Sequence, residues 1–452
     1  MVRLPRWGGN GMSLTSKLTT IAAAGAGSEP DLFISSVRST TSYPVFTDID
    51  VDSSGDIVTV GVVNNPSGAG GSDALILKVD ASGSILWSKT SGLTGTDVFN
   101  GVTTDSSDNI YAAGYITDGV TKSYIQKVSA SGTIAWEKTI SSARKSRLYD
   151  CDISTDENTL FFGGSSAQHN SGINTSADGF YWGKVNTSDG SSLVDYIEGF
   201  TYSQQCRCVA TDDDGSVVFG GIAGYTSTGN MDFFLRASQS NIGSTTEVFP
   251  FGGQQSAYVA DVAHGPNNKT WAAVSGNRSW YFNMTNTTIN DDRINNTSNG
   301  RAYGVVTDSL GNVYFLSYVT SPSGYRHTYI NKFDDSFNKL WSRKLRGVTT
   351  TYNVVPARIA ISNDDQYLYV CGAEAVSLGG SFSGFIFKFP TDGSLTGTYG
   401  DFVYEDVFQN IGGTSRTNRT NISTRIAAPL SLGTPSLTTA TFTPSSTNLE
   451  KG

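Results

Sequence analysis

A repeat of about 50 residues runs through the chain and constrains its fold more than any other feature. Residues 46–91 contain four short runs of alternating apolar residues, separated by turns rich in Gly, Asp and Ser, and the next segment repeats this order. Four strands with this period are typical of one blade of a β-propeller. The inward apolar position of the first run recurs seven times, at Ile49, Val102, Cys151, Val209, Val262, Val305 and Ile359. The sequence therefore predicts an all-β fold, a single β-propeller of about seven four-stranded blades.

Two further columns of the repeat support this alignment. A small residue ends the second run, where a β-bulge or a close backbone approach would leave no room for a side chain. This column consists of Gly61, Gly114, Gly164, Gly221, Ser317 and Gly372. A tryptophan anchors the fourth run in three units, and we expect these indoles to pack between blades. They are Trp87, Trp136 and Trp341.

A basic residue recurs in the third run and allows two interpretations. A ring of such side chains could grip an anion. Alternatively, each basic residue faces solvent on an outer strand, where its aliphatic stem covers the seam between blades. We favour the second interpretation. The column consists of Lys78, Lys127, Lys184, Arg236, Lys332 and Lys388.

Two parts of the repeat are irregular. The fifth unit, at about 256–301, lacks the basic residue and a clear fourth strand, so we expect a degenerate blade. Residues 31–42 resemble a fourth strand without its preceding three, and could close the ring by pairing with the last blade. A strand near 398–404 competes for that place, and the sequence leaves open which terminus closes the ring.

The flanks divide the chain into three parts: an N-terminal anchor segment (1–30), the propeller (31–404) and a Ser/Thr-rich extended C-terminal arm (405–452). In the anchor, Ser13 is suited to a helix N-cap and is followed by Leu14, Leu18 and Ile21 at helical spacing. This pattern predicts a short helix over 13–25. Because so short a helix is marginal alone, we expect Leu14, Leu18 and Ile21 to bind a partner.

Composition excludes several classes of function. The formal net charge is −9 and no basic run exists, which argues against nucleic-acid binding. No apolar stretch is long enough to span a membrane. Basic residues and a small-residue run near the N-terminus superficially suggest a secretory signal, but we expect no cleavage. The four cysteines are too few and too scattered for a disulfide framework, so we expect buried thiols.

Catalytic signatures are missing from the sequence. It contains no GxSxG, HExxH or phosphate-binding glycine loop, and its three histidines lie in different units, where we expect them at the surface. The acidic turns around Asp48–Asp56 and Asp212–Asp214 could hold calcium, but they do not follow EF-hand spacing, and backbone capping is a sufficient reason for them. The sequence therefore predicts a non-enzymatic protein without catalytic, cofactor or metal residues.

Three groups of motifs resemble known proteins. The turns DSSGD and DSSDN, with the segments KVDASGSILWSK and KVSASGTIAWEK, resemble the bacterial propeller repeats that carry Asp-Ser-x-Gly-Asn turns. The segments ISTDENTLFFGG and ISNDDQYLYVCG resemble the surface-layer type of seven-bladed propeller. The opening MSLTSKLTTIAAAGAGS, from Met12, is similar to the start of structural proteins from marine tailed bacteriophages, including tail and fibre components.

The last resemblance implies a structural protein of a virion, in a tail, nozzle, baseplate or fibre. It implies other virion proteins as partners, oligomers within an assembly, and a host surface glycan or receptor as a further partner. The alternative is an exported or cell-surface bacterial propeller that acts as an adhesin or binds glycans. A polysaccharide lyase or hydrolase is a third reading. An enzyme should show convergent carboxylates around one mouth of the central pore.

Overall fold

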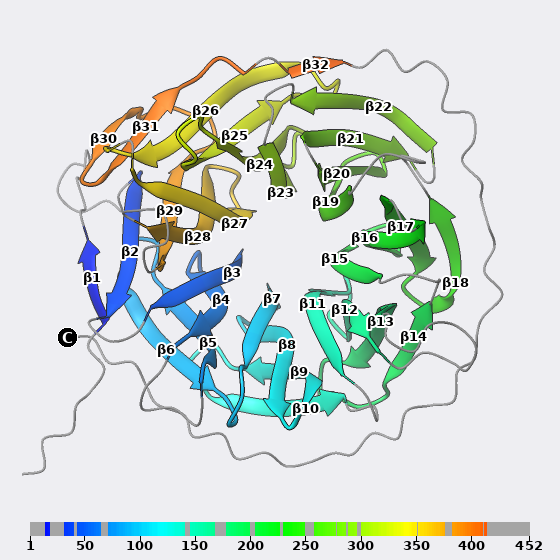
Figure 1. The fold of residues 1–452 in the computed structure, drawn as a ribbon. Helices are drawn as coiled ribbons and strands as arrows, with labels where there is room; N and C mark the ends of the chain where they lie inside the picture. Colours follow the sequence, from blue (N-terminus) through cyan, green and yellow to red (C-terminus); the bar gives the residue numbers. More distant parts are fainter. Residues whose placement is uncertain are drawn as a thin grey trace, which may run out of the picture.

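The computed structural model describes the repeat region, a short N-terminal piece and the chain just beyond the last repeat. The described residues are 14–18, 31–39, 43–64, 71–140, 145–167, 178–198, 204–226, 229–248, 257–276, 278–285, 288–295, 300–349, 351–375, 382–409 and 411–413. They form antiparallel strands in seven sheets arranged around one axis (Figure 1). The prediction of an all-β, seven-bladed propeller is confirmed. The described residues contain no helix, and hence none that could cross a membrane.

In blades 1 to 6, four consecutive strands run outward from the axis. Blade 1 contains β3 (Pro44–Val51), β4 (Ile57–Val63), β5 (Asp73–Val79) and β6 (Ile85–Ser91); blade 2 contains β7 (Val98–Thr104), β8 (Ile110–Asp118), β9 (Val120–Val128) and β10 (Ile134–Ile140); blade 3 contains β11 (Ser146–Ile153), β12 (Thr159–Ser166), β13 (Gly179–Asn186) and β14 (Val194–Glu198). Blade 4 contains β15 (Gln205–Thr211), β16 (Ser216–Thr226), β17 (Gly229–Ser238) and β18 (Asn241–Val248); blade 5 contains β19 (Tyr258–Gly265), β20 (Lys269–Ser275), β21 (Ser279–Thr285) and β22 (Thr288–Asn295); blade 6 contains β23 (Gly300–Thr307), β24 (Val313–Thr320), β25 (Arg326–Phe333) and β26 (Lys339–Gly347).

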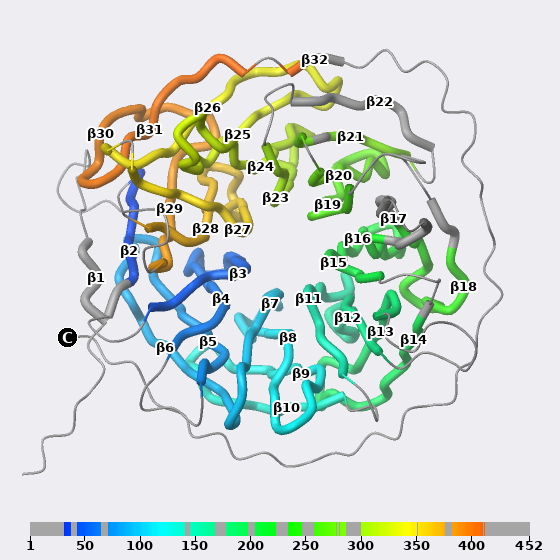
Figure 2. The backbone as a smooth tube through the Cα atoms, in the orientation of Figure 1, coloured from blue at the N-terminus to red at the C-terminus, as the bar shows by residue number. Residues whose placement is uncertain are grey.

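Blade 7 takes its outer strands from the start of the chain. Its inner strands are β27 (Asn353–Ile361), β28 (Tyr367–Ala375) and β29 (Ser383–Pro390). The fourth is β2 (Phe33–Ser39), which pairs with β29, and β1 (Leu14–Leu18) pairs with the far side of β2. Figure 2 shows the blue β2 beside β29. The N-terminal strand therefore closes the ring, which decides the alternative that the sequence left open.

The helix expected over 13–25 is wrong where the structure describes it. Leu14–Leu18 is strand β1, hydrogen-bonded in register from Leu14 opposite Ser39 to Leu18 opposite Ser35. The physical reason is the open edge of β2, whose backbone groups need partners. A short Thr- and Ser-containing segment gains more from that edge than from one or two helical turns. The remainder of the expected helix, including Ile21, lies outside the described residues.

The chain after blade 7 returns along the outside of the ring. Strand β31 (Phe402–Asp406) pairs with β26, β30 (Gly397–Tyr399) pairs with β31, and β32 (Ile411–Gly413) pairs with β22. These strands cover the rims of blades 6 and 5 (Figure 1). The end of β31 and all of β32 fall within residues assigned to the C-terminal arm, and residues 414–452 lie outside the described residues.

Blade 5 is complete, so the expectation of a degenerate unit was wrong. Its fourth strand, TINDDRIN, is too polar to show the alternation of a half-buried strand, but it pairs with β21 on one side and β32 on the other. The basic residue of this blade is Lys269, which lies at the start of the second strand, β20, and not in the third strand. The Lys269 ammonium donates to the Asp335 carbonyl of blade 6 at 2.8 Å.

Apolar side chains are buried mainly in the seams between blades, which form seven clusters. The first-strand column packs in these seams, against the preceding blade. Its seven members, Ile49, Val102, Cys151, Val209, Val262, Val305 and Ile359, are all buried, as predicted. The four cysteines are free and buried, which is also as predicted. Each blade therefore depends on its neighbours for its apolar contacts.

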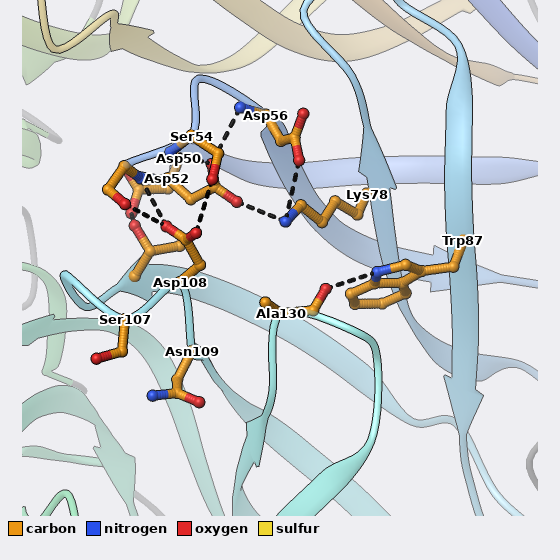
Figure 3. A network of polar contacts seen from close by, with 12 residues as sticks. Asp50, Asp52, Ser54, Asp56, Lys78, Trp87, Ser107, Asp108, Asn109 and Ala130 are labelled. Atoms are coloured by element: carbon orange, nitrogen blue, oxygen red, sulfur yellow. Dashed lines mark hydrogen bonds and ion pairs between the residues drawn. The ribbon is translucent and has the colours of Figure 1, made fainter.

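Several members of the basic and tryptophan columns join neighbouring blades by hydrogen bonds. Trp87 donates from Nε1 to the carbonyl of Ala130 in blade 2 at 3.0 Å (Figure 3), and Lys388 donates to the carbonyl of Ala81 in blade 1 at 3.0 Å. Lys78 instead pairs with Asp52 and Asp56 of its own first hairpin. Lys78 and Lys388 are buried, so the solvent-facing part of our interpretation was wrong. Its seam-covering part is confirmed.

Every first strand contains a bulge, and in five blades a glycine lies directly opposite it. At Gly114 a Cβ atom would lie 1.9 Å from the carbonyl oxygen of Val98, and the other four glycines face the same conflict within 2.2 Å. We predict that Gly114→Ala lowers the free energy of unfolding by about 3 kcal/mol, because the two inner strands must separate locally. Chemical denaturation would measure it.

The matched control is Gly71→Ala, whose Cβ would meet nothing closer than 3.8 Å. This change should alter stability by less than about 0.5 kcal/mol. Equal effects of the two substitutions would contradict the packing argument.

Candidate functional site

The inner edge of each sheet faces the axis and exposes backbone N–H groups without a strand partner. In alternate blades an aspartate just after the bulge satisfies them. Asp48 accepts hydrogen bonds from the N–H of Ile49 beside it and of Val102 in the next blade, at 2.9 and 2.8 Å. Asp150 and Asp261 repeat this arrangement toward blades 4 and 6. These three carboxylates join blade pairs around the axis.

A second row lies closer to the hairpins that connect first and second strands. Asp50 accepts from the N–H of Val51 and from the Thr104 hydroxyl of blade 2. Asp152 accepts from Ile153 and from both the N–H and the hydroxyl of Thr211 in blade 4. The acidic turns around Asp48–Asp56 thus have a structural use. The described residues contain no group of three or more His, Cys, Asp or Glu that could hold a metal ion.

Arg358 occupies in blade 7 the position that aspartate has in blades 1, 3 and 5. Its guanidinium donates to the carbonyl of Tyr303 in blade 6 at 2.9 Å and, across the ring, to that of Arg207 in blade 4 at 3.4 Å. Its Nε lies 3.8 Å from the Asp48 carboxylate. The central axis is therefore crossed at this level by one cation surrounded by carboxylates.

Burial has the largest effect on the pKa values of these axial carboxylates. It raises the pKa of Asp48 to about 7, against the lowering effect of Arg358, and it raises the pKa of Asp50 to about 6. The pKa of Asp150 is also raised, by burial and then by the Asp48 charge. Burial opposes the charge of Arg358, but Asp261, Asp150 and Asp48 outweigh it and raise its pKa.

A second group of side chains lies on the face of the ring where the chain passes from the outer strand of one blade to the first strand of the next. On this face arginines and tyrosines alternate over blades 2 to 6. The Arg147 guanidinium lies 4.6 Å from the Tyr115 ring, and Arg207 lies between Tyr258, at 4.5 Å, and Tyr149, at 5.8 Å. These distances are typical of cation–π contacts. We call the set Arg147, Arg207, Arg301, Arg326, Tyr115, Tyr149, Tyr258, Tyr303 and Tyr318 the arginine–tyrosine cluster.

The cluster continues into blade 6. Arg326 lies 5.1 Å from the Tyr318 ring, which stands 5.6 Å from the Tyr303 ring. Burial raises the pKa of Tyr303 to about 12, with the charges of Tyr258 and Tyr318 adding to the effect and those of Arg301 and Arg326 opposing it. Four of the five tyrosines are half-buried, and only Tyr318 is buried. Arg301 and Arg326 are exposed, so the cluster is open to solvent. It is the strongest candidate site among the described residues.

Sequence reasoning missed this cluster because it did not compare the columns that precede the first-strand apolar position. The column two residues before the apolar one reads Thr, Asn, Tyr, Arg, Ala, Tyr and Ala over the seven blades, and the column two residues earlier reads Val, Val, Arg, Gln, Tyr, Arg and Val. Blades 1 and 7 are apolar or small at these positions, whereas blades 3 to 6 carry Arg, Gln and Tyr. That asymmetry was the available signal.

The opposite face carries an open groove of about 670 Å³ between the first hairpins of blades 4, 5 and 6. In blades 2, 3 and 7 a hairpin carboxylate bridges to the preceding blade: Asp108 accepts from Ser53 and Ser54, Glu157 from Ser106, and Asp365 from Ser309 (Figure 3 shows Asp108 with Ser54). In blades 4 to 6 the matching positions are Gly215, Asn268 and Gly311, which carry no carboxylate. Gly55 of blade 1 carries none either, so the groove lies where three successive hairpins lack this carboxylate.

His264 lines this groove but is not a surface residue, contrary to our expectation. Its Nδ1 lies 3.1 Å from the Asp212 carboxylate, and its Nε2 lies 3.3 Å from the carbonyl oxygen of Ala210. His327 is half-buried, and burial lowers its pKa to about 4. His169 lies outside the described residues. Both ring nitrogens of His264 are thus engaged by groups of the protein itself.

The predicted partner-binding residues separate into two groups. Leu14 and Leu18 begin and end β1, the outermost strand of blade 7, so their backbones contact this chain's own β2. Ile21 lies outside the described residues. No protein-family model matches the chain, and no curated protein matches it.

The axial carboxylates predict a pH dependence of stability. Folding raises the pKa of Asp48 and Asp50, so the folded protein holds protons that the unfolded chain has released. Their stabilisation is complete at low pH and is lost as the pH rises through about 6 and 7. We expect the free energy of unfolding to fall on the order of 3 kcal/mol from pH 5 to pH 8. Denaturant titrations at both pH values would measure it.

Asp48→Asn should lower stability overall and flatten this pH dependence. Asp108→Asn is the control, because hydrogen bonds from Ser53 lower the pKa of Asp108 and keep its titration below this window. A stability that rises between pH 5 and pH 8 would contradict the assignment.

Proposed function

We propose that this chain is a non-enzymatic structural protein of a tailed-bacteriophage virion, in which the propeller serves as a binding platform. The propeller fold suits that role, because a rigid ring presents loops on two faces. The similarity of residues 12–28 to the start of marine phage tail and fibre proteins supports the finer assignment. Other virion proteins are the expected partners.

The placement of the flanks carries this proposal. Strands β1, β30, β31 and β32 all add to the outer rims of blades 5, 6 and 7, and leave the inner strands of the ring uncovered (Figure 1). Strand β1 is the last of its sheet, so one of its edges has no strand partner among the described residues. Such an edge can accept a strand from a neighbouring subunit. The flanks thus suit attachment, and the rest of the ring suits recognition.

An exported propeller adhesin is the alternative from another class. A mature protein that begins near Gly25 or Ser28 would favour export, whereas one that begins at Met1 or Met12 would favour a virion. N-terminal sequencing of the native protein distinguishes the two.

Deletion of residues 12–30 tests the proposal directly. The deletion removes β1 but retains β2, which closes the ring. We expect the shortened protein to fold and yet to be missing from purified particles, as judged by electron microscopy and mass spectrometry.

The control is thermal unfolding of the shortened protein. Its melting temperature should stay close to that of the full chain. Its absence from purified particles would then reflect lost attachment and not misfolding. Normal incorporation of the shortened protein would count heavily against the anchor role. Hydrogen exchange on residues 13–25 adds a second measure, because equal protection in the free and assembled protein would also contradict it.

A further inference from the structure

We propose that the arginine–tyrosine cluster is a binding site for acidic glycans, whose carboxylate or sulfate groups pair with Arg147, Arg207 and Arg326. The inference rests on the proposed function in one respect, since it names the ligand that the platform presents to a host surface. It can nevertheless fail by itself, because glycan binding is measured on the isolated protein.

The guanidinium groups are held in place but not neutralised. Arg147 and Arg326 each lie over one tyrosine ring, and Arg207 contacts two. Stacking fixes the plane of each guanidinium and leaves its N–H edge for a planar anion. No carboxylate among the described residues forms an ion pair with any of the three. By contrast, Arg236, Arg343 and Arg346 elsewhere in the chain are each paired with an acid.

N–H groups of Arg147 and Arg207 that lack an acceptor also support an anion-binding site. The side chain of Arg147 donates no hydrogen bond to any described residue, and its Nε is buried without an acceptor. Among the described residues, Arg207 donates only to the side chain of Gln205, at 2.7 Å, and its Nε is also buried without an acceptor. Buried donors without partners are costly. An anion that pairs with the outer nitrogens of these groups would offset the charge that the fold leaves uncompensated.

The tyrosines make a sugar the best-suited carrier of the anion. Tyr149, Tyr258 and Tyr303 are half-buried, so each leaves part of its side chain exposed beside the arginines. Aromatic faces pack on the apolar face of a sugar ring, and hydroxyls and amides such as Gln205 bond its hydroxyl groups.

Isothermal titration of the purified full chain tests the proposal. The probes are a carboxylated oligogalacturonate, sulfated dextran and neutral dextran. We expect one or both acidic probes to bind with an affinity that weakens as salt rises, and neutral dextran not to bind. The two acidic arms show which anion the cluster prefers.

Arg147→Gln and Arg326→Gln identify the site. Each should weaken binding at least about tenfold while leaving the melting temperature unchanged, because neither side chain is hydrogen-bonded to the described residues. The matched control is Arg236→Gln, which removes an arginine that is paired with Asp214 at the opposite face. That control should bind as the unsubstituted chain does. If it weakens binding equally, the effect is one of net charge and the site is wrong.

Two further probes distinguish the glycan from other polyanions. Binding of poly-L-glutamate as tight as that of the acidic glycans would show that the sugar is not recognised, and would overturn the proposal. Preferential binding of an oligothymidylate would overturn it in favour of nucleic acid. Failure to bind any acidic glycan would also overturn it, but would leave the incorporation test of the N-terminal deletion unaffected.

Discussion

The pairing of β2 with β29 is the interaction on which the rest of the ring depends. Each blade buries its apolar residues against its neighbours, so seven seams are needed, and residues 33–39 supply the outer strand of blade 7 and add Phe33 and Val37 to the seventh seam. This contact joins segments more than 300 residues apart in the chain. Its loop-closure entropy is large, and we expect closure to come late in folding. Until then, two seam surfaces stay exposed.

Closure also sets the geometry of the axis. The inner strands converge there with unpaired N–H groups, and aspartates in blades 1, 3 and 5 bridge each to the following blade. Blades 2 and 6 place Gly101 and Gly304 at the same position, where a side chain would meet Asp150 and Ile359. An odd number of blades cannot complete this alternation. Arg358 stands in the seventh blade and balances part of the carboxylate charge.

The sequence predicted the features that recur in most blades and missed those that differ from blade to blade. Blade number, buried columns and the bulge-facing glycines followed from a period that tertiary structure preserves. The helix over 13–25 was wrong because local spacing could not reveal the open edge of β2. Blade 5 seemed incomplete because its fourth strand, β22, is too polar to show apolar alternation, although its backbone pairs with β21 and β32. The arginine–tyrosine cluster joins residues from five blades, and its members become neighbours only once the ring exists.

The two ends of the chain differ in what they would do under tension. A pull on the N-terminal side separates β1 from β2 and then β2 from β29, which opens the ring itself. A pull on the C-terminal side must first peel β32 from β22 and β31 from β26, and neither pairing belongs to the closure of the ring. Among the described residues, the C-terminal side therefore has three strand pairings outside the closure of the ring, and the N-terminal side has one, between β1 and β2. In an assembly that carries mechanical load, the C-terminal side is the one suited to bear it.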